Sequence, residues 1–485
     1  MPTLLERLNR PIVALLAVAA IAGGVRFWAL SRPPGMVFDE VYYPKAACIL
    51  VGWSNKTCLV RSSDERYWRT NKWDVGSWVH PPLGKWEIAL GIKAFGMRPF
   101  GWRVTTAIAG TLVVVLTAAI AQLLFGSPLW TFVTGLLLGV ENLNVVMSRT
   151  ALLDAHLELW VVVGFLALML DRRWMERSAP AEGDLEPVAS PIWRPWRFAA
   201  GAAFGAAAAV KWSGAAAIPG AVILTYAWET ARRVRGDLSR GRAFARAFAR
   251  ESFGMALAFG VVPVAVYLVT WFPWLHHFGW DMKLWWQNQQ AAWDYQRGLR
   301  STAFDSKTHT FTPTHPYYSR PWTWLLMLRP VNMYAQYPAG RVQQVLAIGN
   351  PAVFWGSFWT LPFTAYAWRR IRDWRAGFAL VTTLSLYLPW FVVSRPQFFF
   401  YVLPVTPFLV LAAVYTVRWL SDATWILHDL ETGTAVESTR HPYRPIAWGY
   451  VIVAVALFVW FYPVLTAQTL TTHAHHLRVW FQHWV

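Results

Sequence analysis

The chain has 485 residues, of which 56% are hydrophobic and only 14% are charged, whereas soluble domains typically carry about 25% charged residues. Together with the 33 tryptophans, which favour the lipid–water interface, this composition excludes an ordinary soluble domain and indicates a protein that crosses a membrane several times. The net charge of +18 does not predict nucleic-acid binding, because many arginines fall in short loops between apolar segments, as the positive-inside rule requires.

A helix needs about 20 apolar residues to cross a bilayer. Eleven such segments are expected, which predicts an all-α polytopic membrane protein built as a single domain over residues 1–485. The segments are 11–30, 102–125, 129–147, 151–171, 197–210, 213–230, 252–272, 345–367, 376–393, 401–420 and 446–466. The fifth is short, so it and the sixth can also be read as one bent helix. The first resembles a cleavable signal peptide in part, but its apolar run reaches membrane length, which favours an uncleaved helix.

The orientation follows from the arginine-rich short loops "DRRWMERS", "ETARRVRGDLSRGRAFARAFARES" and "WRRIRDWRAG". All three follow even-numbered segments and are expected to be cytoplasmic, which places the N-terminus inside and the C-terminus outside. Two long loops, 31–101 and 273–344, then lie outside. Amphipathic pieces of these loops, such as "WDMKLWWQNQQAAWDYQ", are expected to lie flat in the membrane interface.

The only two cysteines, Cys48 and Cys58, both fall in the first long loop. If that loop is extracytoplasmic, a disulfide between them would close a small ring. Two free thiols remain the alternative.

An adjacent acid pair, Asp39 and Glu40 in "FDEVYY", closely follows the first apolar segment. A carboxylate at this position can act as a general base, bind a metal or pair with an arginine. Neighbouring residues point in different directions on a helix or a strand, so the two acids are expected to have different roles. Asp154 is either a second acid or the partner of Arg149. Metal-ligand spacing is absent from the outer loops, so a metal is not indicated, although a divalent ion stays possible in principle.

Five basic residues are expected at the depth of the acid pair, near the outer membrane boundary: His80, Lys85, Arg149, Lys211 and Arg395. A single arginine or lysine at a helix end commonly reaches for lipid headgroups. Several at one depth fit an anionic lipid head better, because arginine offers a planar fork and lysine a point charge to phosphate oxygens. Together with the acid pair, they predict a membrane-embedded transferase that holds a lipid phosphate by cations and activates a nucleophile with a carboxylate.

Six motifs in this order resemble the protein O-mannosyltransferases, which are polytopic glycosyltransferases of the GT-C class. They are "FDEVYYPKAA", "VHPPLGK", "SRTALLDAH", "VKWSG", "HPYYSRPWTWLLMLRPV" and "FFFYVLPVTPF". The resemblance covers most of the chain. It implies transfer of mannose from a polyprenyl-phosphate-mannose donor to Ser or Thr hydroxyls of proteins that cross or leave the membrane, in a single inverting displacement and without a cofactor.

The resemblance also implies roles for individual residues. Asp39 would be the base for the acceptor hydroxyl and Glu40 would support it, with Asp154 and Tyr401 as further supporting residues. The candidates for the donor phosphate are Arg149 and Lys85, followed by His80, Lys211 and Arg395.

One departure from the family concerns the second outer loop. Fungal and animal members carry a large β-rich insert there, which 273–344 is too short to hold. The chain therefore resembles a minimal, bacterial member in the plasma membrane, with its active site expected on the extracytoplasmic face. Whether the protein secretion machinery is a partner stays open at this point.

Three rival functions follow from other features. "AAWDYQR", residues 291–297, partly matches an oligosaccharyltransferase signature, and the first loop is similar to that of enzymes that transfer aminoarabinose to lipid A. Glu141 and Glu158, near helix ends, are the residues that would suit a transporter. A transporter is disfavoured because the charges gather at the outer boundary and not at mid-depth.

Overall fold

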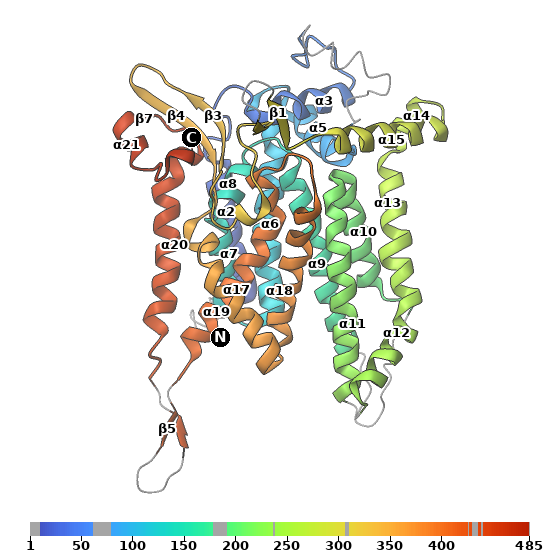
Figure 1. The fold of residues 1–485 in the computed structure, drawn as a ribbon, viewed down its shortest axis with the longest axis vertical. Coiled ribbons are helices and arrows are strands. Elements are labelled where there is room, and N and C mark those ends of the chain that lie inside the picture. Colours follow the sequence, from blue (N-terminus) through green and yellow to red (C-terminus); the bar gives the residue numbers. More distant parts are fainter. Residues whose placement is uncertain are drawn as a thin grey trace, which may run out of the picture.

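The computed structural model describes residues 10–61, 79–177, 192–235, 238–305, 310–424, 426–428, 435–437 and 440–484. Long helices run side by side and form a bundle, with short helices and most of the strands gathered at one end and the strand β5 at the other (Figure 1). The long helices are α2 (Pro11–Phe27), α6 (Pro99–Phe125), α7 (Pro128–Gly139), α8 (Asn142–Ser148), α9 (Asp154–Arg177), α10 (Pro195–Val210), α11 (Ala217–Arg235), α12 (Arg240–Ala256), α13 (Val262–Thr270), α17 (Ser357–Tyr366), α18 (Trp374–Tyr387), α19 (Thr406–Asp422) and α20 (Arg444–Leu465).

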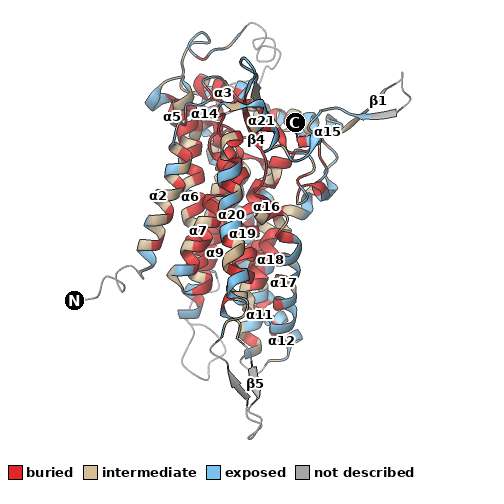
Figure 2. Cartoon of the chain, turned by 90° about the vertical axis from the view of Figure 1, so that its left-hand side faces the viewer, coloured by how far each residue is buried: buried red, intermediate tan, exposed pale blue. Residues whose placement is uncertain are grey.

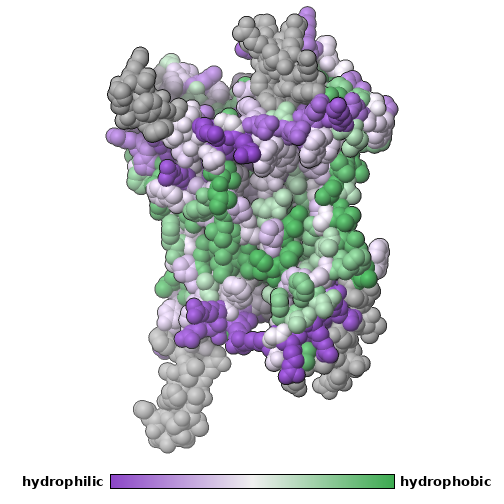
Figure 3. Space-filling view, turned by 45° about the vertical axis from the view of Figure 1, so that its right-hand side comes forward, coloured by the Kyte–Doolittle hydropathy of each residue, from purple (hydrophilic) through white to green (hydrophobic). Residues whose placement is uncertain are grey.

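The surface of the bundle has the polarity of a membrane protein. On the face shown in Figure 3, a hydrophobic band crosses the middle, and hydrophilic residues gather above and below it. Buried residues gather where helices face one another (Figure 2). In the helix Phe399–Asp422, which contains α19, 94% of the most apolar stretch is buried inside the protein. The interior of the protein therefore lies between the helices, while their outer faces are left for lipid.

The predicted number of eleven spans is not confirmed. Within the described residues, five helices are long and apolar enough to cross a membrane, or six if α7 and α8, which meet at a bend of 66°, form one span. Each of the eleven predicted segments overlaps a helix of the structure, but α2 has only 17 residues and α10 only 16. The required length of 18 residues excludes these two helices. Helices α9, with 24 residues, and α11, with 19, are long enough but not sufficiently apolar and uncharged.

One predicted span begins in the wrong kind of element. Residues 345–347 belong to strand β4 (Arg341–Ala347), which pairs with β3 (Val331–Gln336) on one side and with β7 (Leu470–Thr471) on the other. The helices of this region begin later, with α16 (Pro351–Phe354) and then α17. The end of β4 is apolar because it is buried against the bundle, and hydropathy alone does not separate a buried strand from a spanning helix.

The short elements gather at one end of the bundle, which we call the loop end (Figure 1). It holds α3 (Tyr43–Leu50), α5 (Leu83–Phe95), α14 (Phe272–His277), α15 (Met282–Gly298), the sheet β3–β4–β7 and α21 (Thr472–His476). The hairpin of β1 (Thr302–Asp305) with β2 (Thr310–Pro313) also lies at the loop end, whereas the hairpin of β5 (Ile426–His428) with β6 (Ala435–Glu437) lies at the opposite end (Figure 1). The arginine-rich end of α11 and the start of α12 lie at the opposite end, so both predicted long loops share one end, as the arginine pattern indicates.

Helix α15 lies across the loop end and not along the bundle axis (Figure 1). Only Asn288 and Ala292 of this helix are buried, while Trp286 and Trp293 are more than half exposed. A helix that shows aromatic side chains on one face and lies across the bundle suits the membrane interface, which agrees with its amphipathic sequence.

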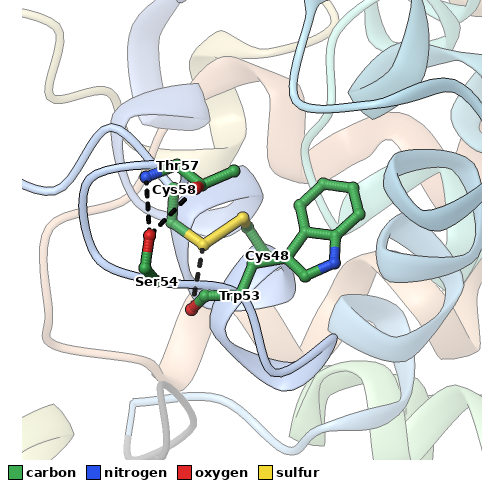
Figure 4. The surroundings of a disulfide bond; sticks show 5 residues. All are labelled: Cys48, Trp53, Ser54, Thr57 and Cys58. Atoms are coloured by element: carbon green, nitrogen blue, oxygen red, sulfur yellow. Dashed lines mark hydrogen bonds between the residues drawn. A yellow bond between two sulfur atoms is a disulfide. The ribbon is translucent and has the colours of Figure 1, made fainter.

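The first outer loop is closed by a disulfide between Cys48 and Cys58 (Figure 4). Both cysteines are fully buried. Ser54 and Thr57 hydrogen-bond to each other within the ring, which stabilises the turn between the two cysteines. Of the two alternatives that the sequence leaves open, the disulfide is therefore the one found. Residues 62–78 of the same loop lie outside the described residues.

Candidate active site

A cavity of about 400 Å³ opens at the loop end of the bundle. Its walls come from the start of α9, the junction of α10 with the short helix η2 (Trp212–Ala216), α15, and the segment that follows η6 (Leu388–Val392). Five residues predicted from the sequence line it: His80, Asp154, Lys211, Arg395 and Tyr401. The rest of the lining is mainly apolar and aromatic, and includes Leu157, Trp212, Trp293, Trp390 and Val393. The cavity thus combines a small charged group with an apolar wall suited to a lipid-linked molecule.

Asp39 lies beside this cavity in the short helix η1 (Phe38–Val41). Its side chain is half-buried, and its charge interacts with those of Lys211, Asp154 and Arg395. Burial raises the pKa of Asp39 to about 6; the charge of Asp154 also raises the pKa, while Lys211 and Arg395 lower it. A carboxylate whose pKa lies near the working pH suits a general base, because it can both accept a proton and release it again.

Glu40 has a different environment from its neighbour. It is fully buried, and its two oxygens accept hydrogen bonds from Arg103 Nε at 2.8 Å and Arg103 Nη2 at 2.7 Å. The same carboxylate accepts the backbone N–H of Val37 at 2.9 Å and of Ala151 at 2.8 Å. Its oxygens are thus occupied by protein groups, so the hydrogen bonds of Glu40 organise the loop. The expectation that the two acids have separate roles agrees with this geometry.

Arg103, on the first turns of α6, was not singled out from the sequence. Besides Glu40, its guanidinium donates to the carbonyls of Leu30, Pro33 and Gly35. This one side chain therefore holds the whole segment that leads into η1. The available signal was an arginine placed inside an apolar segment, which is costly unless the charge is paired.

Lys211 and Asp154 form an ion pair in the cavity wall. Lys211 Nζ lies 2.9 Å from Asp154 Oδ1 and 2.8 Å from Oδ2. Asp154 is the first residue of α9, and Lys211 follows the last residue of α10 in an extended conformation. Of the two alternatives that the sequence leaves open for Asp154, pairing with Arg149 is not the one found, because the end of α10 brings Lys211 to the carboxylate instead.

Arg149 lies outside the lining of the cavity. Its guanidinium donates to the carbonyls of Val25, Arg26, Trp28 and Ala29, at 2.7–3.2 Å. These carbonyls belong to the C-terminal end of α2, where helices leave acceptors without partners and favour a positive charge. The geometry thus gives Arg149 a structural role, and its predicted contact with a donor phosphate has no support from its position.

Lys85 also lies outside the lining, buried behind the loop that carries His80. Its Nζ donates to the backbone carbonyl of His80 at 3.3 Å. Burial, together with the charges of Lys211, Lys85 and Arg395, lowers the pKa of His80 well below its ordinary value. His80 is therefore a neutral imidazole at pH 7, so it faces the cavity as a hydrogen-bonding group and not as the predicted cation.

Arg395 is a cation of the cavity wall for which the described residues provide no acid within ion-pair distance. Its Nη1 donates to Gln296 Oε1, and its Nη2 donates to the hydroxyl of Tyr401 at 2.9 Å. The guanidinium also lies over the Tyr401 ring, 5.7 Å from its centre. Gln296 was not predicted as a site residue, although it stands within the noted "AAWDYQR" motif. Because both contacts are to neutral groups, the charge of Arg395 remains available to an anion.

The two glutamates that would suit a transporter both accept hydrogen bonds from other groups of the protein. Glu158 accepts both bonds of the Asn144 amide and one from Thr406 at 3.1 Å. Glu141 accepts the backbone N–H of Asn144 at 2.7 Å and of Asn350 at 2.8 Å. Both side chains stabilise the bend between α7 and α8, which does not favour a transport role. Among the described residues, no group of three His, Cys, Asp or Glu side chains is placed to hold a metal ion.

Two family models together match nearly the whole chain. The model described as dolichyl-phosphate-mannose-protein mannosyltransferase matches residues 16–279. The model described as the C-terminal four-helix membrane region of protein O-mannosyltransferase matches residues 282–484. The curated polyprenol-phosphate-mannose–protein mannosyltransferase of Mycobacterium tuberculosis is 31% identical over 472 residues, which cover 87% of this chain and 86% of that protein. The protein of the same description from Corynebacterium glutamicum is 27% identical and covers 99% of this chain and 94% of that protein.

Solved structures show the same fold. The protein O-mannosyltransferase complex Pmt1–Pmt2 of S. cerevisiae, bound to its sugar donor, matches with a TM-score of 0.68 at 14% identity over 100% of this chain and 93% of that chain. ArnT from Cupriavidus metallidurans in the apo state matches with a TM-score of 0.54 at 17% identity, over 94% of this chain and 76% of that chain. The family matches and the relatives agree with the motifs and the fold, and this chain belongs to the protein O-mannosyltransferase family.

Proposed function

We propose that this protein transfers mannose from polyprenyl-phosphate mannose to Ser or Thr hydroxyls of protein acceptors. The observation that carries the proposal is that Asp39, a carboxyl with a raised pKa, lies beside a cavity in which Arg395 has no ion-pair partner among the described acids. The names of the relatives, which describe the same donor and a protein acceptor, support it. The apolar side of the cavity fits the first units of a polyprenyl chain.

The reaction needs one proton transfer and one displacement. Asp39 takes the proton of the acceptor hydroxyl as the hydroxyl oxygen attacks C1 of mannose. The bond between C1 and the phosphate oxygen breaks on the opposite side, and its electron pair stays on the phosphate. The products are the mannosyl-protein and polyprenyl phosphate, with the proton on Asp39, and a single displacement of this kind inverts the anomeric carbon.

The cations of the cavity stabilise the charge that develops on the leaving phosphate. Arg395 offers a full positive charge, and Lys211 offers one that is shared with Asp154. Fixed groups of this kind act more strongly in a cavity that excludes water than they do in solution, since nothing has to reorganise during the reaction. Neutral His80 and the Tyr401 hydroxyl are placed to bind hydroxyls of the sugar or oxygens of the phosphate.

The loop end is assigned to the extracytoplasmic face of a bacterial plasma membrane, with the N-terminus in the cytoplasm. Two features support this assignment. The Cys48–Cys58 disulfide lies at the loop end, and disulfides persist in oxidising compartments. The arginine-rich ends of α11 and α12 lie at the other end, as the positive-inside rule requires of the cytoplasmic side. A site on this face would meet acceptor proteins as the secretion machinery delivers them.

The proposal is tested with purified protein in lipid nanodiscs. It is incubated with polyprenyl-phosphate mannose and a Thr-rich peptide, and the peptide is analysed by mass spectrometry for an added hexose. We expect a mannosylated product from the wild type and none from Asp39→Asn. Digestion with anomer-specific mannosidases reports inversion. Parallel incubations contain polyprenyl-phosphate aminoarabinose with lipid A, or a lipid-linked oligosaccharide with the peptide. Transfer in one of these, with none from the mannose donor, would replace the proposal with that rival.

A further inference from the structure

Helix α15 has an unusual place in the cavity. The helix is largely exposed, with only Asn288 and Ala292 buried among its residues. Its C-terminal part nevertheless contributes Trp293, Gln296 and Arg297 to the cavity wall. A weakly packed helix at a reaction site has to be held by specific contacts, and those contacts are candidates for a role in the reaction.

Gln296 supplies such contacts with a single side chain. Its carbonyl oxygen accepts a hydrogen bond from Arg395 Nη1. Its amide nitrogen donates to the backbone carbonyl of Val79 at 3.2 Å, directly before His80. The Gln296 carboxamide therefore joins three segments that lie far apart in the sequence. They are the first outer loop, α15 and the segment after η6 that carries Arg395.

The chemical nature of this residue matters for Arg395. A carboxylate at the same place would form an ion pair with Arg395 and would have to be displaced before a phosphate could bind. An amide fixes the direction of the guanidinium but leaves its charge in place. Arg395 Nε is buried and has no hydrogen-bond partner among the described residues, so at least this donor of the guanidinium is still unused.

We propose that Gln296 is a positioning residue for donor binding, an inference that rests on the proposed function. It holds Arg395 in the direction that receives the donor phosphate, keeps the charge of Arg395 unpaired, and ties that direction to the loop of His80. Gln296 thereby acts through Arg395 and not on the sugar itself.

The test compares Gln296 with Gln289 on the same helix. The side chain of Gln289 accepts a hydrogen bond from the neutral Tyr267 hydroxyl at 2.7 Å and is not part of the cavity lining. The variants Gln296→Glu, Gln296→Ala, Gln289→Glu and Gln289→Ala are prepared in nanodiscs. The dissociation constant of polyprenyl phosphate, which carries no sugar, is measured by native mass spectrometry, and KM and kcat are measured with polyprenyl-phosphate mannose.

We expect Gln296→Glu, which keeps the shape of the side chain, to weaken polyprenyl phosphate binding by about tenfold or more, because the new carboxylate pairs with Arg395. Gln296→Ala should weaken polyprenyl phosphate binding by about three- to tenfold, since Arg395 loses its hydrogen bond to Gln296 but keeps its charge. For both, the rise in KM should exceed the fall in kcat at saturating donor. Both Gln289 variants should match the wild type.

Wild-type affinity in Gln296→Glu, or an equal loss in Gln289→Glu, would overturn the inference. If Gln296→Glu does not fold, as judged by its melting temperature, the affinity of Gln296→Ala decides, and a wild-type value there would also overturn it. The two proposals fail separately. A wild type that binds polyprenyl phosphate through Gln296 but transfers no mannose would contradict the proposed function alone. If Gln296→Glu and Gln296→Ala bind polyprenyl phosphate and transfer mannose as well as the wild type does, this inference alone is contradicted.

Discussion

Glu40 and Arg103 form a bidentate ion pair, with oxygen–nitrogen distances of 2.7 and 2.8 Å, and neither side chain is exposed to solvent. The same glutamate binds the backbone N–H of Ala151, in the turn between α8 and α9. The loop that carries Asp39 is therefore attached to the bundle by the residue next to Asp39 in the sequence. The adjacent acids should respond very differently to substitution.

Replacing Glu40 by Gln should destabilise the protein, because Arg103 would then be a buried charge without a counterion. Breaking a buried pair on one side costs about 3–5 kcal/mol. Thermal unfolding followed by tryptophan fluorescence should show a lower melting temperature for Glu40→Gln and an unchanged one for Asp39→Asn. Equal melting temperatures for the two variants would contradict the structural role of Glu40.

Replacing Asp39 by Asn should remove turnover and spare donor binding. An amide cannot accept the hydroxyl proton, and loss of a general base lowers kcat by about 10²–10⁴-fold. Single-turnover assays should show this loss, while the dissociation constant of polyprenyl phosphate stays at or below the wild-type value, because a negative charge beside the phosphate is removed. An active Asp39→Asn variant would show that another group takes the proton.

The pH dependence follows from the pKa of Asp39, which burial raises to about 6. The base must be deprotonated, so kcat/KM should fall as the pH drops through 6 and should level off above about 7. Arg395 lowers this pKa, so Arg395→Met should move the acidic limb to higher pH. If the acidic limb of the kcat/KM profile stays at the same pH in Arg395→Met, the group that titrates is not Asp39.

Arg149 and Arg395 make a matched pair of arginines with opposite expected effects. Arg149→Met leaves carbonyls at the end of α2 without donors and should destabilise the protein by about 2–4 kcal/mol, with donor affinity kept. Arg395→Met should keep the melting temperature and weaken polyprenyl phosphate binding by about tenfold or more. Melting temperatures and dissociation constants for the two variants check both halves. The reverse pattern would restore Arg149 as the phosphate ligand.

Much of the site could be predicted from the sequence because its residues stand in short motifs at helix ends. Asp154, Lys211 and Arg395 lie at one depth in the sequence pattern, and the structure brings them together. The partner of each charge could not be predicted. Arg149 and Arg395 look alike as arginines near helix ends. The packing of α2 against the turn after α8 gives the Arg149 guanidinium backbone carbonyls as partners, whereas Arg395 contacts neutral side chains in the cavity wall.

Two further residues escaped prediction for related reasons. Arg103 lies inside an apolar segment, and its counterion is 63 residues away in the sequence. Gln296 is an unremarkable polar residue on an amphipathic helix until the Arg395 segment folds against it. The start of the 345–367 segment was misjudged because its apolar residues are buried by protein and not by lipid.

The closeness of Asp39 to the phosphate cations has a consequence for product release. Under the proposed function, the donor is a phosphodiester with one negative charge, and the product is a monoester whose second pKa is about 6. During the chemical step the net charge of the site does not change, because the proton that leaves the acceptor stays on Asp39. The charge becomes more negative only when Asp39 releases that proton to water. Repulsion between the restored carboxylate and the phosphate would then expel polyprenyl phosphate, so that resetting the base and emptying the cavity are one event.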